Sequence, residues 1–275
     1  MGSSSSKTQV VLAPEDIATY CETGKLFGAL IQQIFRDLNK FKSGMDIAIH
    51  FTVAVREKVH ASAWFPFAAQ ENQYKEPFGS SVCISVNNCV AHGRPSSDPF
   101  HSGDLISVDM GFAIPSLRFP NRFLHFDAAF TKKYKPKRKA STTLAYAPLE
   151  ALQEIQRQES LFLKDITRFI ADVGVKHDYS RVDTLCGHGI GYSLHEPPFI
   201  QNGIEISDLK LIPNTVVCPE PMYIRGEEGT YLDSDGWAVM TRGLSSHWET
   251  MFLVQENGLV DLLGITSQKF TGEET

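Results

Sequence analysis

Three features that mark common protein classes are missing from this sequence. Its five cysteines include no Cys-x-x-Cys pair, so neither a disulfide framework nor a thiolate zinc site is indicated, and a reducing, cytoplasmic setting is expected. No apolar run reaches the length of about 18 residues that a membrane helix needs, and the chain begins without the apolar region of a signal peptide. Basic residues do not dominate either: the net charge of -6 at pH 7 argues against a dedicated nucleic-acid-binding protein.

The composition that remains is that of an ordinary globular protein, with 42% hydrophobic and 21% charged residues. A chain of 275 residues can bury about three quarters of its unfolded surface. No linker or low-complexity break divides it, so we expect a single domain from residue 7 to residue 275. Residues 1–6 resemble an expression tag and are left out of the fold prediction.

Three stretches have helical patterns. Apolar or small residues spaced three and four apart predict a helix over Pro14–Leu38, and Gly24 and Gly28 on its apolar face indicate close packing. The pattern Ser-x-x-Asp at 43–46 is a capping box and predicts the start of a second helix. A third, long helical stretch is expected over Pro148–Gly174, opened by its proline and closed by its glycine.

Short apolar runs predict the strands. Ser81–Val86 and Cys89–Gly93, joined by two asparagines, indicate a strand, a turn and a second strand that ends near His92. A lone histidine is more often structural than functional, so His92 by itself is a weak indication of a site. Further strands are expected at Leu105–Gly111, Phe123–Phe130, Trp237–Met240 and Ser245–Val254.

Two of these strands contain an aspartate, Asp109 in one and Asp127 in the other. A carboxylate inside an apolar strand is costly unless its charge is paired. Carboxylates on adjacent strands repel each other, and a bound divalent cation is the simplest means of keeping both ionised. The alternative is a pair of unrelated aspartates on edge strands.

The stretch Cys186–Phe199 is the most informative part of the sequence. Its glycines around His188 leave room for the imidazole to approach an ion or a substrate closely. His195 follows, and the diproline at 197–198 is expected to end any regular element. By contrast, the Asp-x-Asp-Gly at 233–236 is too short for a calcium loop and indicates a hairpin turn.

Five residues of metal-ligand type stand out in these contexts: Asp109, Asp127, His188, Glu220 and Glu249. Carboxylate oxygens with one imidazole suit Mn, Fe(II), Co or Zn, and four carboxylates carry enough charge for two divalent ions. Two ions about 3.5–4 Å apart can share a water and ionise it near neutral pH.

In order and spacing, these residues and their surroundings resemble the methionine aminopeptidases. The resemblance covers nearly the whole chain and rests on Val82–Asn87, Ala91–Gly93, Ser102–Asp109, Asp127, Gly187–Gly191, His195–Pro198, Pro219–Met222 and Glu249. It implies an α+β pita-bread fold, a pseudo-twofold antiparallel sheet with helices on the outer face, shared with prolidases and Xaa-Pro aminopeptidases. The interval from Glu220 to Glu249 leaves no room for the helical insertion of type II enzymes, and no extension for zinc fingers precedes the domain, so the resemblance is to the bacterial type I form.

The resemblance implies an enzyme that removes the initiator methionine from nascent proteins. Asp109 would chelate one metal ion, whereas Asp127 and Glu249 would bridge both ions. His188 and Glu220 would complete the coordination. A hydroxide shared by the two ions would attack the first peptide carbonyl, and Glu220 would shuttle its proton.

The resemblance also implies which residues meet the substrate. His195 would hydrogen-bond the scissile amide and stabilise the tetrahedral intermediate, and His92 would contact the new amine. An apolar pocket would accept the methionine side chain, because a thioether packs well against aromatic and sulfur-bearing walls. By position, this pocket would include Phe78, Cys83, Leu194 and Trp237.

The chain departs from the family pattern in a few places. Ala113–Leu124 is an insertion between the two aspartates, and Phe126 stands where the family usually has glycine. His247 replaces the usual glutamine, and Thr-Met follows Glu249 where His-Thr is common. No ligand is lost, so these departures bear on substrate preference and catalytic rate rather than on the fold.

Two other functions stay open. An Xaa-Pro aminopeptidase or prolidase would normally carry a large N-terminal domain, and a catalytically idle binding protein on the same fold would be free to lose its ligands. The basic run Lys132–Lys139 is a solvated loop by default, and its functional interpretation is a contact with ribosomal RNA through phosphate neutralisation. We expect no membrane contact and a monomer.

Overall fold

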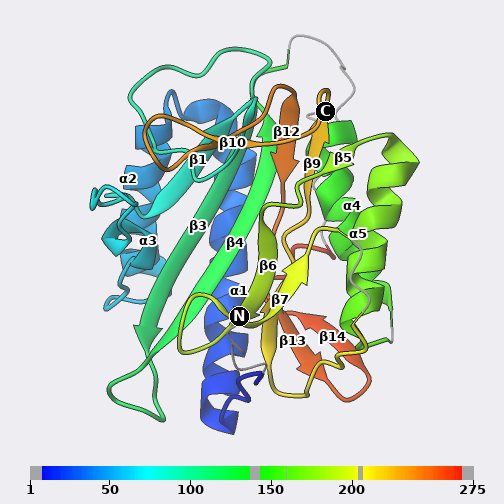
Figure 1. Ribbon diagram of the computed structural model, residues 1–275. Coiled ribbons are helices and arrows are strands. Elements are labelled where there is room, and N and C mark those ends of the chain that lie inside the picture. The colour runs from blue at the N-terminus through cyan, green and yellow to red at the C-terminus, as the bar shows by residue number, and fades with distance from the viewer. Residues whose placement is uncertain (1–7, 137–142, 159, 204–206, 268–275) are drawn as a thin grey trace.

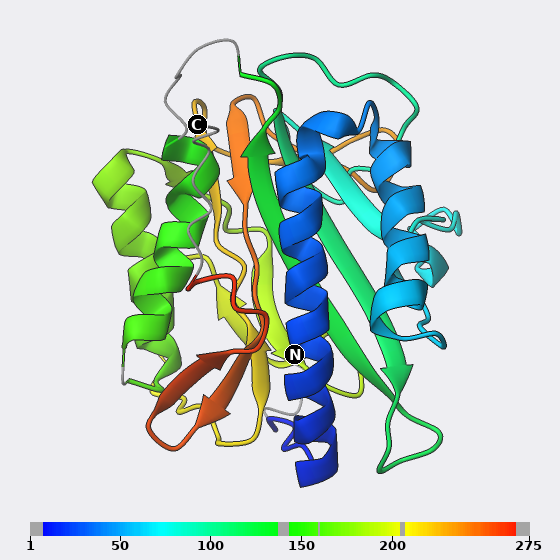
Figure 2. The same ribbon diagram turned by 180° about the vertical axis from the view of Figure 1, so that it is seen from behind.

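The computed structural model describes residues 8–136, 143–158, 160–203 and 207–267. Strands form the middle of the molecule, and the long helices pack together on one face of them, as the front and back views show (Figure 1; Figure 2). Residues 1–6, the predicted tag, lie outside the described residues.

The helices fall into two groups along the chain. The first group is α1 (Pro14–Asp37), α2 (Gly44–Ala54) and the short α3 (Pro66–Ala69), with a 3-10 turn at Leu38–Lys40 and a π-helical turn at Val55–Val59. The second group is α4 (Thr143–Arg157) and α5 (Leu163–His177). The predicted capping box is confirmed, because the Ser43 hydroxyl accepts a hydrogen bond from the Asp46 N–H and the Asp46 carboxylate accepts one from the Ser43 N–H.

Within the described residues, the strands pair antiparallel in four sheets. One sheet has the order β1 (Val82–Val86), β3 (Leu105–Pro115), β4 (Phe123–Lys133). A second has the order β14 (Gly258–Asp261), β13 (Phe252–Gln255), β8 (Val216–Cys218), β6 (Cys186–Ile190), β7 (Glu196–Gln201). The third sheet has the order β12 (Leu244–His247), β9 (Met222–Arg225), β5 (Ser180–Arg181). The fourth has the order β10 (Tyr231–Leu232), β11 (Val239–Met240), β2 (Cys89–Ala91).

The close packing predicted for the glycine face of α1 is confirmed. A Cβ atom on Gly28 would lie 2.0 Å from the backbone oxygen of Leu263, and one on Gly24 would lie 2.8 Å from that of Leu262. The C-terminal segment therefore runs against the backbone of α1. Deeper in the core, Trp248 packs against Phe35 of α1 at 5.9 Å between ring centroids, which joins the two halves of the chain.

The prediction of one helical stretch over Pro148–Gly174 was wrong. The helix begins earlier, at Thr143, with Pro148 inside it, and the chain leaves the helical conformation between Arg157 and Leu163. The break forms because the backbone bonds to another segment there: the Leu163 N–H donates to Leu209 O, and the Leu211 N–H donates to Leu161 O. Apolar residues continue across the break, so the sequence pattern hid it.

Three strand predictions also need correction. The diproline does not end regular structure, since Pro197 and Pro198 lie inside β7, which is an edge strand and tolerates missing N–H donors. The expected strand Ser245–Val254 is divided into β12 and β13, because Glu249 between them pairs with Ala129 of β4 instead. The expected strand Trp237–Met240 is shorter than predicted, because only Val239–Met240 pairs with neighbouring strands.

The predicted insertion, Ala113–Leu124, forms the end of the hairpin of β3 and β4. The ladder continues to the pair Pro115↔Phe123, and the loop occupies only the residues between them. Trp64, in the segment that precedes α3, pairs with Ala113 through hydrogen bonds of 2.9 and 2.7 Å. The end of this hairpin thus anchors the segment that carries α3.

Replacing Gly28 by alanine tests the contact between α1 and the C-terminal segment. Alanine raises helix propensity by about 1 kcal/mol, but its methyl group would overlap the Leu263 carbonyl and force the backbones apart. We expect a net loss of about 2 kcal/mol in the free energy of unfolding, measured by urea denaturation. Ala29→Ser on the exposed side of the same helix is the control and should change stability by less than about 0.5 kcal/mol; equal stability of both variants would contradict the packing.

Candidate metal centre and substrate cavity

The two strand aspartates point to the same side of the β3–β4 hairpin. Asp109 is paired with Ala129, and Asp127 is paired with Gly111, two residues further along β3. Side chains at such diagonal positions share one face of the ladder and lie close enough to interact. The two aspartates are therefore not unrelated, because both line one cavity. Asp109 lies on the central strand of its sheet, whereas Asp127 lies on β4, an edge strand.

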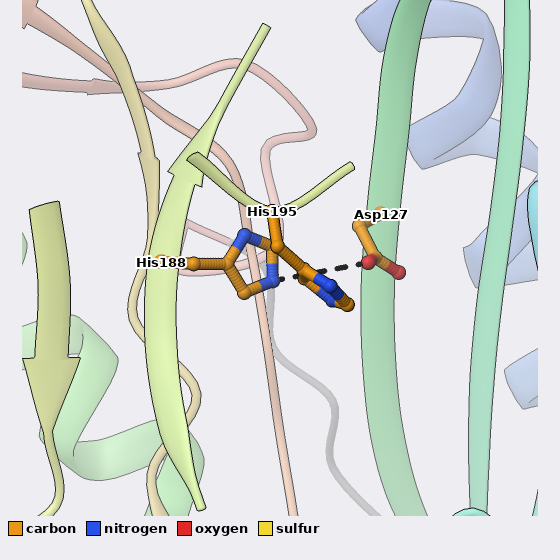
Figure 3. A group of neighbouring side chains, drawn as sticks. All are labelled: Asp127, His188 and His195. Carbon is orange, nitrogen blue, oxygen red and sulfur yellow. Dashed lines mark ion pairs between the residues drawn. The ribbon is translucent and has the colours of Figure 1, made fainter. Parts of the chain in front are cut away.

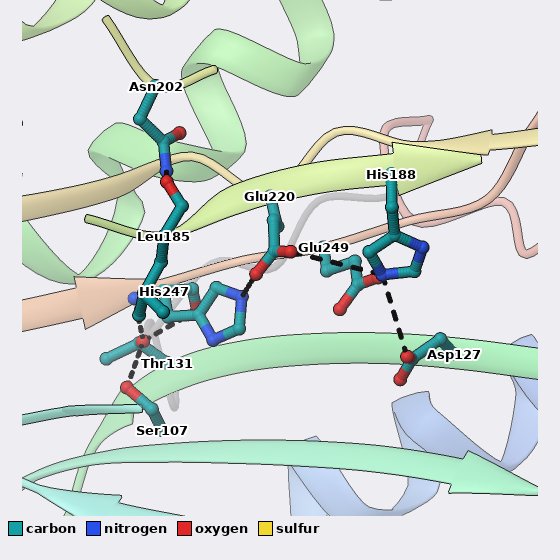
Figure 4. Close-up of polar contacts among 9 residues, drawn as sticks. All are labelled: Ser107, Asp127, Thr131, Leu185, His188, Asn202, Glu220, His247 and Glu249. Carbon is teal, nitrogen blue, oxygen red and sulfur yellow. Dashed lines mark hydrogen bonds and ion pairs between the residues drawn. The ribbon is translucent and has the colours of Figure 1, made fainter. Parts of the chain in front are cut away.

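His188 of β6 presents one ring nitrogen to these carboxylates. Its Nδ1 lies 3.0 Å from the backbone oxygen of Gly189, which assigns the proton to Nδ1 and leaves the lone pair on Nε2. That Nε2 lies 3.7 Å from Glu249 Oε1, 3.9 Å from Glu220 Oε1 and 4.0 Å from Asp127 Oδ2 (Figure 4). A neutral imidazole held by a backbone acceptor in this way is the usual form of a metal ligand.

The glycines beside His188 have a packing reason. A Cβ on Gly187 would lie 2.4 Å from Cys218 O, and one on Gly189 would lie 2.5 Å from Pro197 O. Neighbouring strands thus approach the β6 backbone closely on both sides. Glu220 follows β8. The backbone of Glu249 is fixed by two hydrogen bonds with Ala129, in which Glu249 N lies 2.9 Å from Ala129 O and Ala129 N lies 3.3 Å from Glu249 O.

The ligand atoms form overlapping groups that fit divalent cations. Asp109, Asp127 and Glu249 have ligand atoms within 4.8 Å of one another, and Asp127 forms a second such group with His188 and His195. One oxygen on each of the carboxylates of Asp109, Asp127 and Glu249 is buried and accepts no hydrogen bond from the described part of the chain. Buried oxygens without donors are the chemistry that a hard or borderline cation satisfies.

Burial and repulsion between neighbouring carboxylates raise the pKa values of Asp127, Glu220 and Glu249. Burial raises the pKa of Asp127 well above its usual value, and the charges of Glu249, Asp109 and Glu220 raise it further. The pKa values of Glu220 and Glu249 are raised in the same way, by burial first and then by neighbouring carboxylates. Burial lowers the pKa of His188 to about 3, so its imidazole is neutral and able to bind a metal at neutral pH.

The two other predicted histidines lie at the same cavity. The ring centroid of His195 is 4.5 Å from that of His188 (Figure 3). His92 follows β2 with a φ of 58°, a left-handed conformation that is uncommon for a residue with a side chain and is often found at functional sites. Burial lowers the pKa of His92 to about 4, and it also lowers the pKa of His195, so both act as neutral imidazoles.

The walls of the cavity agree in part with the predicted methionine pocket. Phe78, Cys83 and Trp237 line it, with Phe78 and Trp237 edge to face at 5.1 Å between centroids. The turn at 233–236 orients this wall, because the Asp235 carboxylate accepts hydrogen bonds from the N–H groups of Trp237 and Ala238. Leu194 is instead packed in the hydrophobic core and is not one of the cavity-lining residues in the described chain.

Sequence reasoning missed two cavity residues on the segment of α3. Phe67 and Gln70 line the cavity, and the Phe67 ring packs against Gly111, where a Cβ would lie 2.9 Å from it. The only available signal was that Pro66 stands where a helix begins, and nothing in the sequence indicated that this helix meets β3. The sequence also indicated no role for His247. In the structure, possible metal-ligand atoms of His247, Glu220 and Glu249 lie within 4.8 Å of one another.

Four carboxylates and an imidazole converging beside an apolar cavity define a metal-dependent hydrolase site. The family model described as metallopeptidase family M24 matches residues 23–256, and the chain belongs to this family. The predicted resemblance to the methionine aminopeptidases is confirmed by relatives from several bacteria.

Two relatives and two solved structures illustrate the match. A methionine aminopeptidase of Treponema pallidum is 30% identical over 171 residues, which cover 61% of this chain and 65% of that protein. A methionine aminopeptidase of Clostridium perfringens is 33% identical over 196 residues, which cover 66% of this chain and 72% of that protein. The chain thus spans about two thirds of the length of these relatives.

The crystal structure of methionine aminopeptidase from Rickettsia prowazekii superimposes with a TM-score of 0.79 at 23% identity, covering 93% of this chain and 100% of that one. A prolidase from Pyrococcus furiosus gives a TM-score of 0.65 at 16% identity, covering 93% of this chain and 65% of that one. These similarities confirm the predicted pita-bread fold. Within the described residues, no helix combines the length and apolar character needed to cross a membrane.

The raised carboxyl pKa values predict how stability depends on pH without metal. A carboxyl whose pKa is raised by folding stabilises the fold at low pH, and this contribution is lost as the pH rises through the folded pKa. The lowered histidine pKa values act in the opposite direction, but only up to about pH 6.5, above which unfolded histidine is also neutral. From about pH 6.5 to about pH 8.5, we therefore expect the free energy of unfolding of the metal-free protein to fall.

Urea denaturation with chelator present, followed by circular dichroism, measures this trend, and excess Mn²⁺ should remove it. Asp109→Asn deletes one of the repelling charges and should weaken the decline. A flat or rising stability over that range in the metal-free wild type would show that the carboxylates do not repel one another in the fold.

Proposed function

We propose that this protein is a metalloaminopeptidase that removes the initiator methionine from nascent proteins. The observation that carries the proposal is the convergence of Asp109, Asp127, His188, Glu220 and Glu249 on a cavity that aromatic side chains also line. The names of the relatives and of the solved structures with the higher TM-score support methionine as the residue released. The larger of the two core clusters contains residues of both halves of the chain, which supports one catalytic domain over residues 7–275.

The centre would hold two divalent ions, chosen from Mn, Fe(II), Co and Zn. Asp109 would bind one ion, Asp127 and Glu249 would bridge both, and the remaining ligands would be His188 and Glu220. When bound, such ions acidify a water and stabilise negative charge on the scissile carbonyl oxygen. The four carboxylates supply the charge that two divalent ions need, which supports two ions rather than one.

The protein groups would share the other steps. Glu220, with its pKa raised by burial, would take a proton from the attacking water and deliver it to the leaving amine. His195 would donate a hydrogen bond to the tetrahedral intermediate, and His92 would contact the substrate near the new amine. Phe78, Cys83 and Trp237 would enclose the thioether, with Phe67 closing the cavity over Gly111.

Release of free methionine from short peptides tests the proposal. Protein stripped with chelator and refilled separately with Mn, Fe(II), Co or Zn should cleave Met-Ala and Met-Gly peptides and leave Met-Leu and Ala-Pro peptides intact. Glu249→Ala should lower kcat/KM by at least about 10³-fold, because it removes a ligand shared by both ions, while the fold remains. Asp37→Asn, far from the cavity, is the matched control.

Each other outcome assigns a different function. Cleavage of the Ala-Pro peptide instead would identify an Xaa-Pro aminopeptidase or prolidase activity. A folded, metal-loaded protein that cleaves nothing would be a binding protein on this fold. Undiminished turnover by Glu249→Ala would contradict the two-ion centre.

We further propose that the protein acts in the cytoplasm as a monomer and contacts ribosomal RNA through Lys132–Lys139. All five cysteines are free, which supports a reducing compartment. Residues 137–139 of the basic run lie outside the described residues. Of the rest, Lys132 donates to Phe35 O at 2.8 Å and so contributes to the fold, whereas Lys135 is exposed.

Sedimentation with ribosomes over a series of salt concentrations tests this contact. Replacing Lys133, Lys135 and the basic residues at 137–139 by alanine, and keeping Lys132, should weaken binding and flatten its salt dependence. A variant with as many lysines replaced elsewhere, including Lys25 and Lys75, is the control. Unchanged co-sedimentation and salt slope would exclude the contact.

A further inference from the structure

We propose that His247 is a sixth metal-binding side chain of this centre and supplies it with a second imidazole nitrogen. The inference rests on the two-ion centre of the proposed function, to which it adds a ligand. The set of five ligands that the family resemblance implies does not include His247.

The geometry around Glu220 carries the proposal. Its Oε1 lies 3.9 Å from His188 Nε2, and its Oε2 lies 3.4 Å from His247 Nε2. Glu220 therefore stands between the two imidazoles, with one oxygen facing each (Figure 4). Ligand atoms of Glu220, His247 and Glu249 lie within 4.8 Å of one another.

These distances suit joint coordination. Two donor atoms at about 2.1 Å from one ion lie about 3 to 3.5 Å apart when the angle between them is octahedral or tetrahedral. The separation of 3.4 Å between His247 Nε2 and Glu220 Oε2 falls in that range. The corresponding distances from His188 Nε2, a predicted ligand, are longer.

The burial of His247 indicates that its Nε2 needs a partner. The side chain is 2% exposed, and within the described part of the chain Nε2 has no hydrogen bond of acceptable geometry. A buried ring nitrogen without a partner is costly, and an ion bound between it and the carboxylates would remove that cost.

The backbone holds His247 in this orientation. Its N–H donates to Thr131 Oγ1 at 2.8 Å, and the Thr131 hydroxyl donates to the carbonyl of His247, also at 2.8 Å. Ser107 lies 2.7 Å from the same hydroxyl oxygen (Figure 4). Because β12 is also paired with β9 at His247↔Met222, the imidazole is fixed by two sets of backbone contacts.

A second imidazole changes which metals the centre prefers. Nitrogen ligands favour Co²⁺ and Zn²⁺ over Mn²⁺ more strongly than carboxylate oxygens do. The centre should therefore bind Co²⁺ in preference to Mn²⁺ by a wider margin than a site with one imidazole.

X-ray absorption of the protein loaded with two Co²⁺ ions tests the proposal independently of activity. We expect one imidazole per ion on average in the wild type, and one imidazole per two ions in both His247→Gln and His188→Gln. Competition titration should show that His247→Gln weakens Co²⁺ binding by about 10–100-fold and Mn²⁺ binding by less. His101→Gln, at an exposed histidine, is the control and should match the wild type.

An imidazole count that is the same in the wild type and in His247→Gln would overturn the proposal, and so would equal weakening of both metals. In either case His247 would only hydrogen-bond Glu220. Circular dichroism of each variant verifies that it is folded. Failure of the proposed function is separately visible: two imidazoles would still be counted in a protein that releases no methionine.

Discussion

Repulsion among buried carboxylates is the constraint on which the rest of this structure depends. Asp109, Asp127, Glu220 and Glu249 meet beside one cavity. Burial raises the pKa of all four, and the charges of neighbouring carboxylates raise those of Asp127, Glu220 and Glu249 further. Such a group is stable only where protons or cations neutralise it. The neutral imidazoles around it, and the buried oxygens without donors, are suited to cations.

The fold resists this repulsion by fixing the ligands through backbone pairing. Ala129 of β4 is the central contact, since it is paired with Asp109 within the hairpin and with Glu249 from the other half of the chain. His188 is held on β6, between neighbours that approach its flanking glycines. These side chains therefore cannot separate without breaking strand pairing in both halves of the chain.

The β3–β4 hairpin also positions one wall of the cavity. Ala113 of β3 pairs with Trp64, and the residues that follow Trp64 bring Phe67 and Gln70 to the cavity. Phe67 lies over Gly111, which is paired with Asp127, so an aromatic wall stands directly beside the carboxylates. An apolar wall beside the cations would exclude water and strengthen their electrostatic effect.

The sequence by itself determined the elements whose local chemistry allows few residue types, and it indicated five candidate metal ligands. Helix α1, the capping box of α2 and the five candidate ligands were predictable because helix periodicity, capping and metal binding each restrict the local sequence. Only the tertiary structure decided the break between α4 and α5, the division of β12 from β13, the position of Leu194 in the core and the approach of His247 to Glu220. Each of these depends on a partner distant in the chain, as in the bonds of Leu163 to Leu209 and of Glu249 to Ala129, and local sequence does not specify such partners.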